Sequence, residues 1–262
     1  MKGLTIEIKN SAAIIAGGVS GLGEAVARTL LDGGARMALL DLNQELGEQM
    51  AATLGDSAMF FPVNVTDHGE VDAAVEKIES AFGSFHIVVN CAGIGGSVRI
   101  VSKEGVVSPD WFTNIVNVNL VGTFNLLRAT TPTLMDNAPN NEGERGVVIN
   151  TSSIAAFDGQ VGQSAYSASK GGIVSMTLTM TREFANNGIR VMTILPGIFD
   201  TPLLGRVPEN VRERLGQQVP FPPRLGRPEE FASLARHIIE NPYLNGECIR
   251  LDGGLRMGFG RK

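Results

Sequence analysis

The chain alternates short, continuously apolar runs with longer segments whose apolar residues recur at helical spacing. The apolar runs, which we interpret as strands, cover residues 12–16, 36–40, 58–63, 85–90, 146–151, 189–195 and 247–251. The helical segments cover residues 21–31, 44–54, 68–82, 111–130, 165–187 and 228–240. Because runs such as 87–89 and 147–149 contain no polar position, these strands are expected to be buried on both faces. The pattern predicts an α/β fold, a doubly wound parallel sheet of about seven strands with helices on both faces.

Two segments interrupt this alternation. Residues 135–145 (MDNAPNNEGER) are polar and are expected to form a solvated loop. Residues 200–227 contain five prolines and three glycines and follow the end of a predicted strand. Ligands of open α/β sheets bind beside the carboxyl ends of the strands, so this segment is predicted to be a substrate lid, with a surface linker as the alternative.

Composition narrows the class of protein. The 262 residues include 22 basic and 27 acidic side chains, a net charge of −5, and no basic block that would favour a nucleic-acid partner. The two cysteines and three histidines have no metal-ligand spacing, so we expect no metal site and no disulfide framework. No run is long and apolar enough for a membrane span, and the first ten residues lack a secretory apolar region. We expect a cytoplasmic protein without a membrane partner.

A glycine-rich turn separates the first predicted strand from the first predicted helix. Gly17, Gly21 and Gly23 lie in the sequence AGGVSGLG, where the backbone must reverse and let a pyrophosphate approach amides at a helix N-terminus. Asp41 ends the second strand, where a carboxylate can accept hydrogen bonds from a ribose 2′-hydroxyl and would repel a 2′-phosphate. Arg36 begins that strand instead of ending it, so the sequence favours NAD over NADP. The alternative for Asp41 is a cap of the following helix.

Tyr166 and Lys170 lie four residues apart in a predicted helix, so their side chains share one face. An ammonium group near a phenol stabilises the phenolate, and we expect it to lower the pKa of Tyr166. Ser153 follows the strand at 146–151, where its hydroxyl can bind a substrate oxygen. A solvated helix face is the alternative for the pair taken alone.

In combination, these residues resemble the short-chain dehydrogenase/reductase family. The resemblance rests on the glycine turn, Asn90-Cys91-Ala92-Gly93, Asn119, Ser153, Tyr166-Ser167-Ala168-Ser169-Lys170 and Pro196-Gly197, and it covers nearly the whole chain. It implies one Rossmann-type domain over residues 1–262 that uses NAD. Stretches such as 157–163 and 219–222 are most similar to family members that act on 3-hydroxyacyl-CoA thioesters.

The resemblance also implies a role for each matching position. Tyr166 would be the acid and base, Lys170 would hold the nicotinamide ribose, Ser153 would orient the substrate oxygen, and Asn119 would hold a proton-relay water. Gln163 would face the substrate. The implied cofactor-binding residues are Gly17, Ser20, Gly21, Leu22, Gly23, Asp41, Asn64, Val65, Asn90, Ala92, Gly93, Tyr166, Lys170, Pro196, Gly197, Ile198 and Thr201.

Three positions depart from the family pattern. Ala16 replaces a threonine whose hydroxyl usually braces the Asn-Ala-Gly turn, and Asn64 replaces an aspartate that usually meets the adenine amino group. Losing one neutral hydrogen bond costs about 0.5–1.5 kcal/mol, so cofactor binding is expected to be weaker but retained. The carbonyl of Asn64 could still accept from the adenine. Cys91, in place of a second asparagine, is interpreted as a packing residue.

These observations favour an NAD-dependent enzyme that interconverts 3-hydroxyacyl-CoA and 3-oxoacyl-CoA in fatty acid metabolism. The same residues would serve a 3-oxoacyl-carrier-protein reductase or a steroid or secondary alcohol dehydrogenase, and a non-catalytic NAD-binding subunit is a further alternative. The family resemblance implies a homo-oligomer, a dimer or tetramer, with homotetramer as the favoured state.

Overall fold

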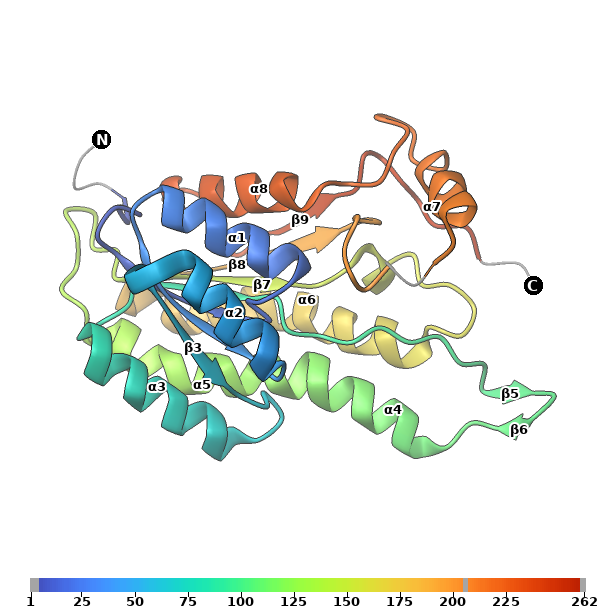
Figure 1. The fold of residues 1–262 in the computed structure, drawn as a ribbon, viewed down its shortest axis with the longest axis horizontal. Helices are drawn as coiled ribbons and strands as arrows, with labels where there is room; N and C mark the ends of the chain where they lie inside the picture. The colour runs from blue at the N-terminus through green and yellow to red at the C-terminus, as the bar shows by residue number, and fades with distance from the viewer. Residues whose placement is uncertain (1–4, 205–206, 260–262) are drawn as a thin grey trace.

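A parallel sheet forms the centre of the molecule (Figure 1). The computed structural model describes residues 5–204 and 207–259. Across these residues, seven strands pair in the order β3-β2-β1-β4-β7-β8-β9, and every pairing is parallel. The strands are β1 (Ala12–Ala16), β2 (Arg36–Asp41), β3 (Ala58–Pro62), β4 (Ile87–Asn90), β7 (Gly146–Thr151), β8 (Ile189–Pro196) and β9 (Cys248–Leu251). Each expected strand is therefore present, and the doubly wound parallel sheet is confirmed.

Helices cover both faces of this sheet (Figure 1). One face packs against α1 (Gly21–Asp32), α2 (Gln44–Leu54) and α8 (Pro228–Glu240). The other packs against α3 (His68–Phe82), α5 (Gly122–Asp136) and α6 (Ser164–Phe184). Successive strand residues point to opposite faces, so Ala13 and Ile15 of β1 join the first cluster while Ile14 joins the second. This explains why the central strands have continuously apolar sequences.

The helical segment expected at 111–130 is longer and is not uniform. It consists of α4 (Pro109–Val116), a π-helical turn at Asn117–Val121 and then α5. A π-turn inserts one residue into the helical ladder, and such turns often occur at functional sites. Here the turn contains Asn119, whose side chain is fully buried.

The polar segment 135–145 is a loop from Asn137 onward, and most of its residues are exposed, as its composition suggested. Its first residues continue α5, and Asn137 and Glu144 are buried. Asn137 donates from its amide to the carbonyl oxygens of Phe85 and Arg145, at 2.8 and 3.0 Å. The solvated loop is therefore anchored at two buried polar residues that satisfy backbone groups, which a hydropathy pattern does not reveal.

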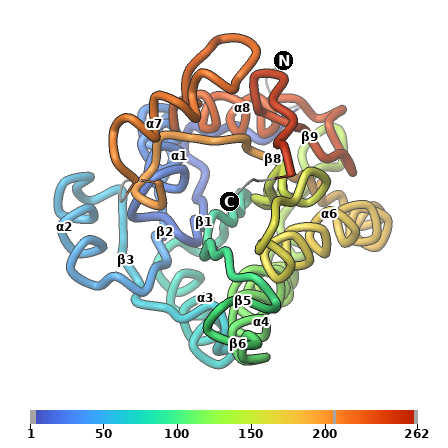
Figure 2. The backbone as a smooth tube through the Cα atoms, turned by 90° about the vertical axis from the view of Figure 1, so that its right-hand side faces the viewer, coloured from blue at the N-terminus to red at the C-terminus, as the bar shows by residue number. Residues whose placement is uncertain are grey.

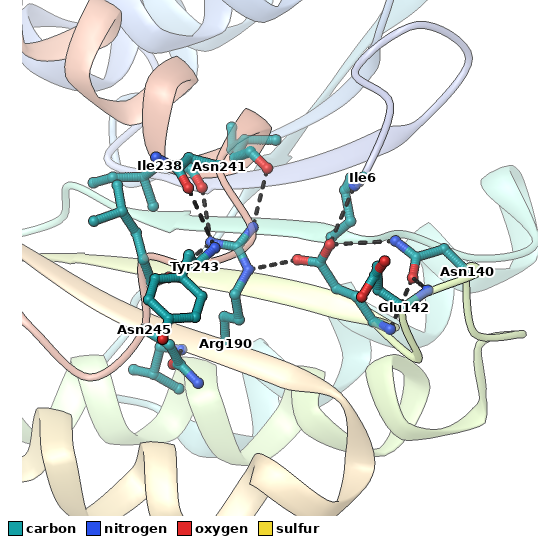
Figure 3. Close-up of polar contacts among 12 residues, drawn as sticks. Ile6, Asn140, Glu142, Arg190, Ile238, Asn241, Tyr243 and Asn245 are labelled. Atoms are coloured by element: carbon teal, nitrogen blue, oxygen red, sulfur yellow. Dashed lines mark hydrogen bonds and ion pairs between the residues drawn. The ribbon is translucent and has the colours of Figure 1, made fainter. Parts of the chain in front are cut away.

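A buried ion pair joins this segment to β8 (Figure 3). Arg190 Nε lies 2.6 Å from Glu144 Oε1, and both side chains are about one-twentieth exposed. The Arg190 guanidinium also donates to the carbonyl oxygens of Ile238, Ile239 and Leu244, at 2.7–3.0 Å. Arg190 therefore caps the end of α8 and fixes the amino-terminal edge of the sheet.

The opposite, carboxyl edge of the sheet contains the loops expected to bind ligands (Figure 2). The chain leaves β1 toward β2 and β3 and then crosses to β4 on the other side, so β1 and β4 mark the point where the strand order reverses. A short hairpin, β5 (Val101–Ser102) and β6 (Gly105–Val106), and helix α7 (Glu209–Gly216) also lie at this edge (Figure 1). The proposed lid at 200–227 contains α7, and its residues 205–206 lie outside the described residues. No helix in the described part of the chain is long and apolar enough to cross a membrane.

Candidate active site

Two adjoining cavities lie at the carboxyl ends of the strands. The first, of about 370 Å³, lies over β1, β2 and β4, and the second, of about 400 Å³, lies over β4, β7 and β8. Both are lined by Leu22, Gly93, Ile94, Thr201 and Leu203, so they form one continuous cleft. We call them the dinucleotide cavity and the reaction cavity.

The glycine turn forms one wall of the dinucleotide cavity. Gly17 adopts a φ of +68°, and a side chain there would place its Cβ atom 2.6 Å from the backbone nitrogen of Ala92. A Cβ atom at Gly23 would lie 2.0 Å from the carbonyl oxygen of Gly17. Only glycine therefore permits this close packing of turn, helix and neighbouring strand. The turn leads directly into the N-terminus of α1, where free amides and the helix dipole favour a phosphate.

Asp41 and Asn64 lie at the far end of the same cavity. Asp41 ends β2 and accepts a hydrogen bond from the backbone nitrogen of Asn43 at 3.0 Å. Helix α2 is capped by Asn43 instead, so the capping alternative for Asp41 is not what the structure shows. Arg36 lies at the other end of β2, where its guanidinium contacts the Phe82 ring and carbonyl oxygen. The described residues that line this cavity include no lysine or arginine.

Asn64 presents its amide differently from our expectation. Its carbonyl oxygen accepts from both the backbone nitrogen and the hydroxyl of Thr66, at 3.1 and 2.8 Å. Both lone pairs of that oxygen are therefore used within the protein. In the protein by itself the Asn64 carbonyl is therefore occupied by Thr66, and acceptance from an adenine stays a prediction that would require one of these bonds to be exchanged.

The Asn90-Cys91-Ala92-Gly93 turn is braced from within the protein, although Ala16 lacks the usual hydroxyl. Asn90 is buried, accepts from the backbone nitrogen of Ala92 at 3.1 Å and donates to the Thr123 hydroxyl at 2.7 Å. The backbone nitrogen of Cys91 donates to the Ala16 carbonyl at 2.8 Å. Asn90 thus lies behind the cleft and does not line it. Burial raises the pKa of the Cys91 thiol to about 11, which favours a neutral packing role.

The reaction cavity brings Ser153, Tyr166 and Lys170 together. Ser153 follows β7, and its hydroxyl accepts from the backbone nitrogen of Ala155 at 3.1 Å and is hydrogen-bonded to the Tyr166 phenol. Tyr166 and Lys170 lie in successive turns of α6, and Lys170 Nζ is 5.9 Å from the centre of the Tyr166 ring. The spacing in the sequence therefore predicted their shared face correctly.

Burial dominates the acid–base properties of this group. It raises the pKa of the Tyr166 phenol, and the hydrogen bond from Ser153 offsets only part of that rise. Burial also lowers the pKa of Lys170 to about 8, and its Nζ donates to the carbonyl oxygen of Thr151 at 2.9 Å. The expected lowering of the Tyr166 pKa by Lys170 is therefore wrong for the protein by itself, because desolvation of the phenolate outweighs the attraction of an ammonium directed elsewhere.

Asn119 connects the π-turn to this group. Its carbonyl oxygen accepts from the backbone nitrogen of Ile94 at 2.8 Å, and its NH₂ donates to the Ile94 carbonyl and the Ser169 hydroxyl, at 3.0 and 3.1 Å. Because both donors are used within the protein, the Asn119 side chain fixes the Ile94 backbone instead of offering a donor to water. Like Asn90, it lies behind the cavity lining.

The remaining walls come from segments far apart in the sequence. The predicted residues Gln163, Pro196, Gly197, Ile198 and Thr201 all line the reaction cavity. The loop at Ile94–Ser97 also lines this cavity, as do Leu203 and Leu204 of the predicted lid, whereas sequence reasoning missed Met257. Nothing in the local sequence marked Met257, because it follows the last strand and reaches the cavity only through the tertiary fold.

The comparisons with known proteins agree with this geometry. The sequence profile of the short chain dehydrogenase family matches residues 11–212, and this chain belongs to that family of oxidoreductases. The chain is 50% identical over 252 residues to 3-hydroxyacyl-CoA dehydrogenase type-2 of Rattus norvegicus, which covers 95% of this chain and 97% of the rat protein.

Solved structures show the same similarity. A crystal structure of 3-hydroxyacyl-CoA dehydrogenase type-2 from Mycobacterium avium aligns with a TM-score of 0.92 and 38% identity, over 98% of this chain and 100% of that one. A 3-ketoacyl-(acyl-carrier-protein) reductase from Brucella melitensis, solved in complex with NADH, aligns with a TM-score of 0.85 and 29% identity, over 95% of this chain and 100% of that one.

Proposed function

We propose that this protein interconverts 3-hydroxyacyl-CoA and 3-oxoacyl-CoA, with NAD as the hydride carrier. The observation that carries the proposal is the meeting of Ser153, Tyr166 and Lys170 in one cavity that opens into a glycine-walled cleft. The similarity to 3-hydroxyacyl-CoA dehydrogenase type-2 over nearly the whole chain supports the choice of substrate.

The cleft has the features that a nicotinamide dinucleotide requires. The glycine turn and the α1 N-terminus would hold the pyrophosphate through Gly17, Ser20, Gly21, Leu22 and Gly23. The adenosine half would lie along Asp41, Asn64, Val65, Ala92 and Gly93, with Asn90 bracing that wall from behind. The nicotinamide half would lie against Pro196, Gly197, Ile198 and Thr201, with Lys170 on its ribose.

Asp41 supports NAD over NADP. Its carboxylate ends β2 inside the dinucleotide cavity, where it would accept from a ribose 2′-hydroxyl and repel a 2′-phosphate. The described lining residues provide no cation that would offset this repulsion.

The residues of the reaction cavity would transfer one proton between Tyr166 and the substrate oxygen, toward Tyr166 in oxidation and toward the substrate in reduction. The bound dinucleotide would supply the hydride acceptor or donor. Ser153 would hold the substrate oxygen, and Tyr166 would accept the alcohol proton during oxidation or donate it to the ketone oxygen during reduction. The raised pKa of Tyr166 keeps the phenol protonated and ready to donate in the protein by itself. Oxidation would therefore depend on the positive charge of Lys170 and of the oxidised nicotinamide to stabilise the phenolate.

Asn119 would keep the cavity in shape for this transfer. By clamping the Ile94 backbone and the Ser169 hydroxyl it joins the end of β4 to the catalytic helix α6. The proton-relay water that the family resemblance implies stays a prediction, and the backbone around Ile94 is where it would bind.

The segment at 200–227 would act as the substrate lid. Leu203 and Leu204 line the reaction cavity, and Thr201 approaches the glycine turn, so the segment touches both halves of the cleft. The cytoplasm as the compartment, fatty acid metabolism as the setting and a homotetramer as the assembly stay predictions. The exposed Phe112, Val121 and Phe124 on the helices that include Asn119 support a subunit contact.

The test is oxidation of NADH, followed by absorbance, with acetoacetyl-CoA as the substrate. Parallel reactions use NADPH, an acetoacetyl carrier protein, and a steroid or small secondary-alcohol pair. Fast turnover with NADH and the CoA ester is the expected result. Preference for the carrier protein would instead assign the reductase that the Brucella structure exemplifies, and inactivity on every pair would leave a dinucleotide-binding subunit.

Asp41→Ala tests the cofactor choice in the same assay. The KM for NADH is expected to rise about tenfold, because the charge-assisted hydrogen bond to the 2′-hydroxyl is lost. The preference over NADPH should shrink, because the repulsion of its 2′-phosphate is lost as well. Asp56→Ala, at an exposed aspartate in a short 3-10 turn, is the control. Strong NADPH preference in the unaltered enzyme would contradict the assignment.

A further inference from the structure

The residues that follow β9 reach back to the reaction cavity. Residues 253–259 are treated as one unit, the 253–259 segment. Its Met257 lines the same cavity as Ser153 and Tyr166, although it lies about a hundred residues further along the chain. None of the motif residues of the cleft belongs to this segment, so its presence at the cavity needs a separate cause.

A network of charged side chains fixes the start of this segment. Arg250 of β9 donates from Nε to Asp252 Oδ2 at 2.8 Å and from Nη2 to Asp158 Oδ2 at 2.6 Å. The same Nη2 donates to the carbonyl oxygen of Leu255 at 2.9 Å, within the segment itself. Arg256 adds a second contact to Asp252 at 3.1 Å. The Arg250 guanidinium holds the pKa of Asp158 below its usual range, so this bridge stays ionised at neutral pH.

The far end of the segment is tied to the loop that precedes the catalytic helix. The backbone nitrogen of Val161 donates to the Phe259 carbonyl at 3.1 Å, and Gln160 Nε2 donates to the Gly258 carbonyl at 3.0 Å. The backbone nitrogen of Gln160 in turn donates to the side chain of Gln163, which lines the reaction cavity. Asp158 belongs to the same loop, so the segment is attached to this loop at both of its ends.

The segment also contacts the end of the proposed lid. Gly253 has a φ of +61°, and a Cβ atom there would lie 2.5 Å from Val219 Cγ1. The backbone nitrogen of Phe221 donates to the Gly253 carbonyl at 3.2 Å. The 253–259 segment therefore contacts both the loop at 157–163 and the lid at 200–227, and its Met257 lines the reaction cavity.

We propose that the 253–259 segment is a wall of the substrate-binding site, in which Met257 limits the length of the acyl chain and Arg250 is a positioning residue that holds the wall in place. The guanidinium suits this task because its planar fork bridges two carboxylates and a carbonyl at once, which a lysine ammonium cannot do in the same geometry. Methionine is flexible and apolar, so it packs against short acyl chains and obstructs longer ones. The substrate part of this inference rests on the proposed function.

The first experiment compares Arg250→Gln, Arg250→Lys and Asp158→Asn with the unaltered enzyme. For Arg250→Gln we expect the KM for acetoacetyl-CoA to rise about tenfold while kcat and the KM for NADH stay within about twofold, because the wall contacts substrate and not the dinucleotide. Arg250→Lys and Asp158→Asn should give smaller rises. Arg236→Gln, which removes an exposed ion pair with Glu240 on α8, is the control and should leave all constants unchanged. Equal changes in both KM values, or no change in either, would overturn the positioning role.

The second experiment changes the wall itself. Met257→Ala should raise the ratio of kcat/KM for 3-oxooctanoyl-CoA to that for acetoacetyl-CoA by about tenfold. The smaller side chain leaves space for a few more methylene groups of the acyl chain, and burying them in an apolar pocket gives a preference of this size. Met257→Phe should lower the ratio. An unchanged ratio in both variants would remove Met257 from the specificity role.

A third measurement needs no substrate and separates the two proposals. Amide hydrogen exchange of Val161, Leu255 and Phe221 reports the bonds that hold the segment and its neighbours. Arg250→Gln should accelerate exchange at these amides and leave the strands β1 and β4 protected. This outcome in an enzyme that is inactive on thioesters would refute the proposed substrate and keep the positioning role, whereas unchanged exchange would refute the positioning role whatever the substrate.

Discussion

Burial changes the pKa values of two ionisable residues in the reaction cavity. Tyr166 and Lys170 lie in the same cavity, yet burial moves the pKa of the phenol upward and that of the ammonium downward, to about 8. Each group is therefore shifted toward its neutral form. The protein alone holds a protonated phenol beside a lysine that is easily deprotonated, and a bound oxidised dinucleotide would add the positive charge that favours the phenolate.

Replacement of Tyr166 by phenylalanine isolates the proton transfer. We expect kcat to fall by about 10²–10⁴-fold, the usual contribution of a positioned acid or base, with unchanged affinity for NADH. Steady-state turnover and a fluorescence titration with NADH measure the two effects. The other tyrosine of the chain, Tyr243, is almost fully exposed, and Tyr243→Phe should turn over normally. Normal turnover in Tyr166→Phe would show that another group moves the proton.

The lowered pKa of Lys170 should appear in the stability of the ligand-free protein. Lysine in the unfolded chain keeps its proton up to about its ordinary value of 10.5, whereas folded Lys170 loses it above about 8. Between these values the unfolded chain binds more protons, so the free energy of unfolding rises with pH. The gain is about 2 kcal/mol from about pH 7 to about pH 9.5.

Denaturant unfolding of Lys170→Met across this pH range provides the comparison. The variant lacks the titration of Lys170. The free energy of unfolding of the unaltered protein should therefore rise relative to that of the variant by about 2 kcal/mol from about pH 7 to about pH 9.5. Lys77→Met, at an exposed position of α3, should keep the pH dependence of the unaltered protein. Parallel curves for the unaltered protein and Lys170→Met would show that the lysine keeps its ordinary pKa.

At the scale of elements, the cleft depends on how close one segment of backbone comes to another. The turn between β1 and α1 packs Gly23 against Gly17 and Gly17 against Ala92. The π-turn at Asn117–Val121 similarly brings Asn119 to the end of β4, where it satisfies the Ile94 backbone. The glycine turn thus positions the cleft through close backbone contacts, which leave no space for larger side chains, and the π-turn does so through the Asn119 side chain.

Gly23→Ala tests this packing. Because the new Cβ atom would lie 2.0 Å from the Gly17 carbonyl oxygen, the turn must move, and we expect affinity for NADH to fall at least about tenfold. Gly69→Ala, in the first turn of α3, places its Cβ atom 3.3 Å from the end of the Asp67 side chain and should bind NADH normally. Calorimetric titration measures the affinity, and thermal unfolding shows whether each variant is folded. Tight binding by a folded Gly23→Ala would contradict the role of the turn.

At the scale of the whole molecule, the two ends of the strands contain different features. The carboxyl edge contains the cleft, and the amino-terminal edge contains the buried Arg190–Glu144 pair (Figure 3). Glu144 also accepts from the Ile6 backbone nitrogen at 3.3 Å, so this cluster joins the start of the described chain to β8 and α8. The buried pair and the cleft therefore lie at opposite ends of the strands.

Arg190→Met should destabilise the protein by about 3–5 kcal/mol, because Glu144 would remain buried without its partner. Adding Glu144→Gln should restore part of this loss. Removal of the exposed pair between Arg28 and Glu24 by Arg28→Met should cost about 1 kcal/mol or less. Denaturant unfolding measures all three, and KM values should stay unchanged where the protein is folded. Equal losses for Arg190→Met and Arg28→Met would show that the buried pair has no special weight.

The sequence by itself determined the strands, most helices and most of the residues that line the cleft. Continuously apolar runs identify the strands of a sheet that is covered on both faces, and helical spacing placed Tyr166 and Lys170 on one face. Glycines and an acidic strand end located the dinucleotide cavity. These features are local, because each depends on neighbouring residues along the chain.

Only the tertiary structure decided the features that depend on residues far apart in the sequence. Asn137 and Glu144 of the polar loop are buried because they pair with the Phe85 carbonyl and with Arg190, and the Tyr166 pKa rises because the folded cavity removes the phenol from water. Met257 lines the reaction cavity in a segment whose start is bonded to Arg250, and Arg250 pairs with Asp158, more than ninety positions away. Burial and long-range pairing arise only when the sheet assembles, so no local pattern could have disclosed them.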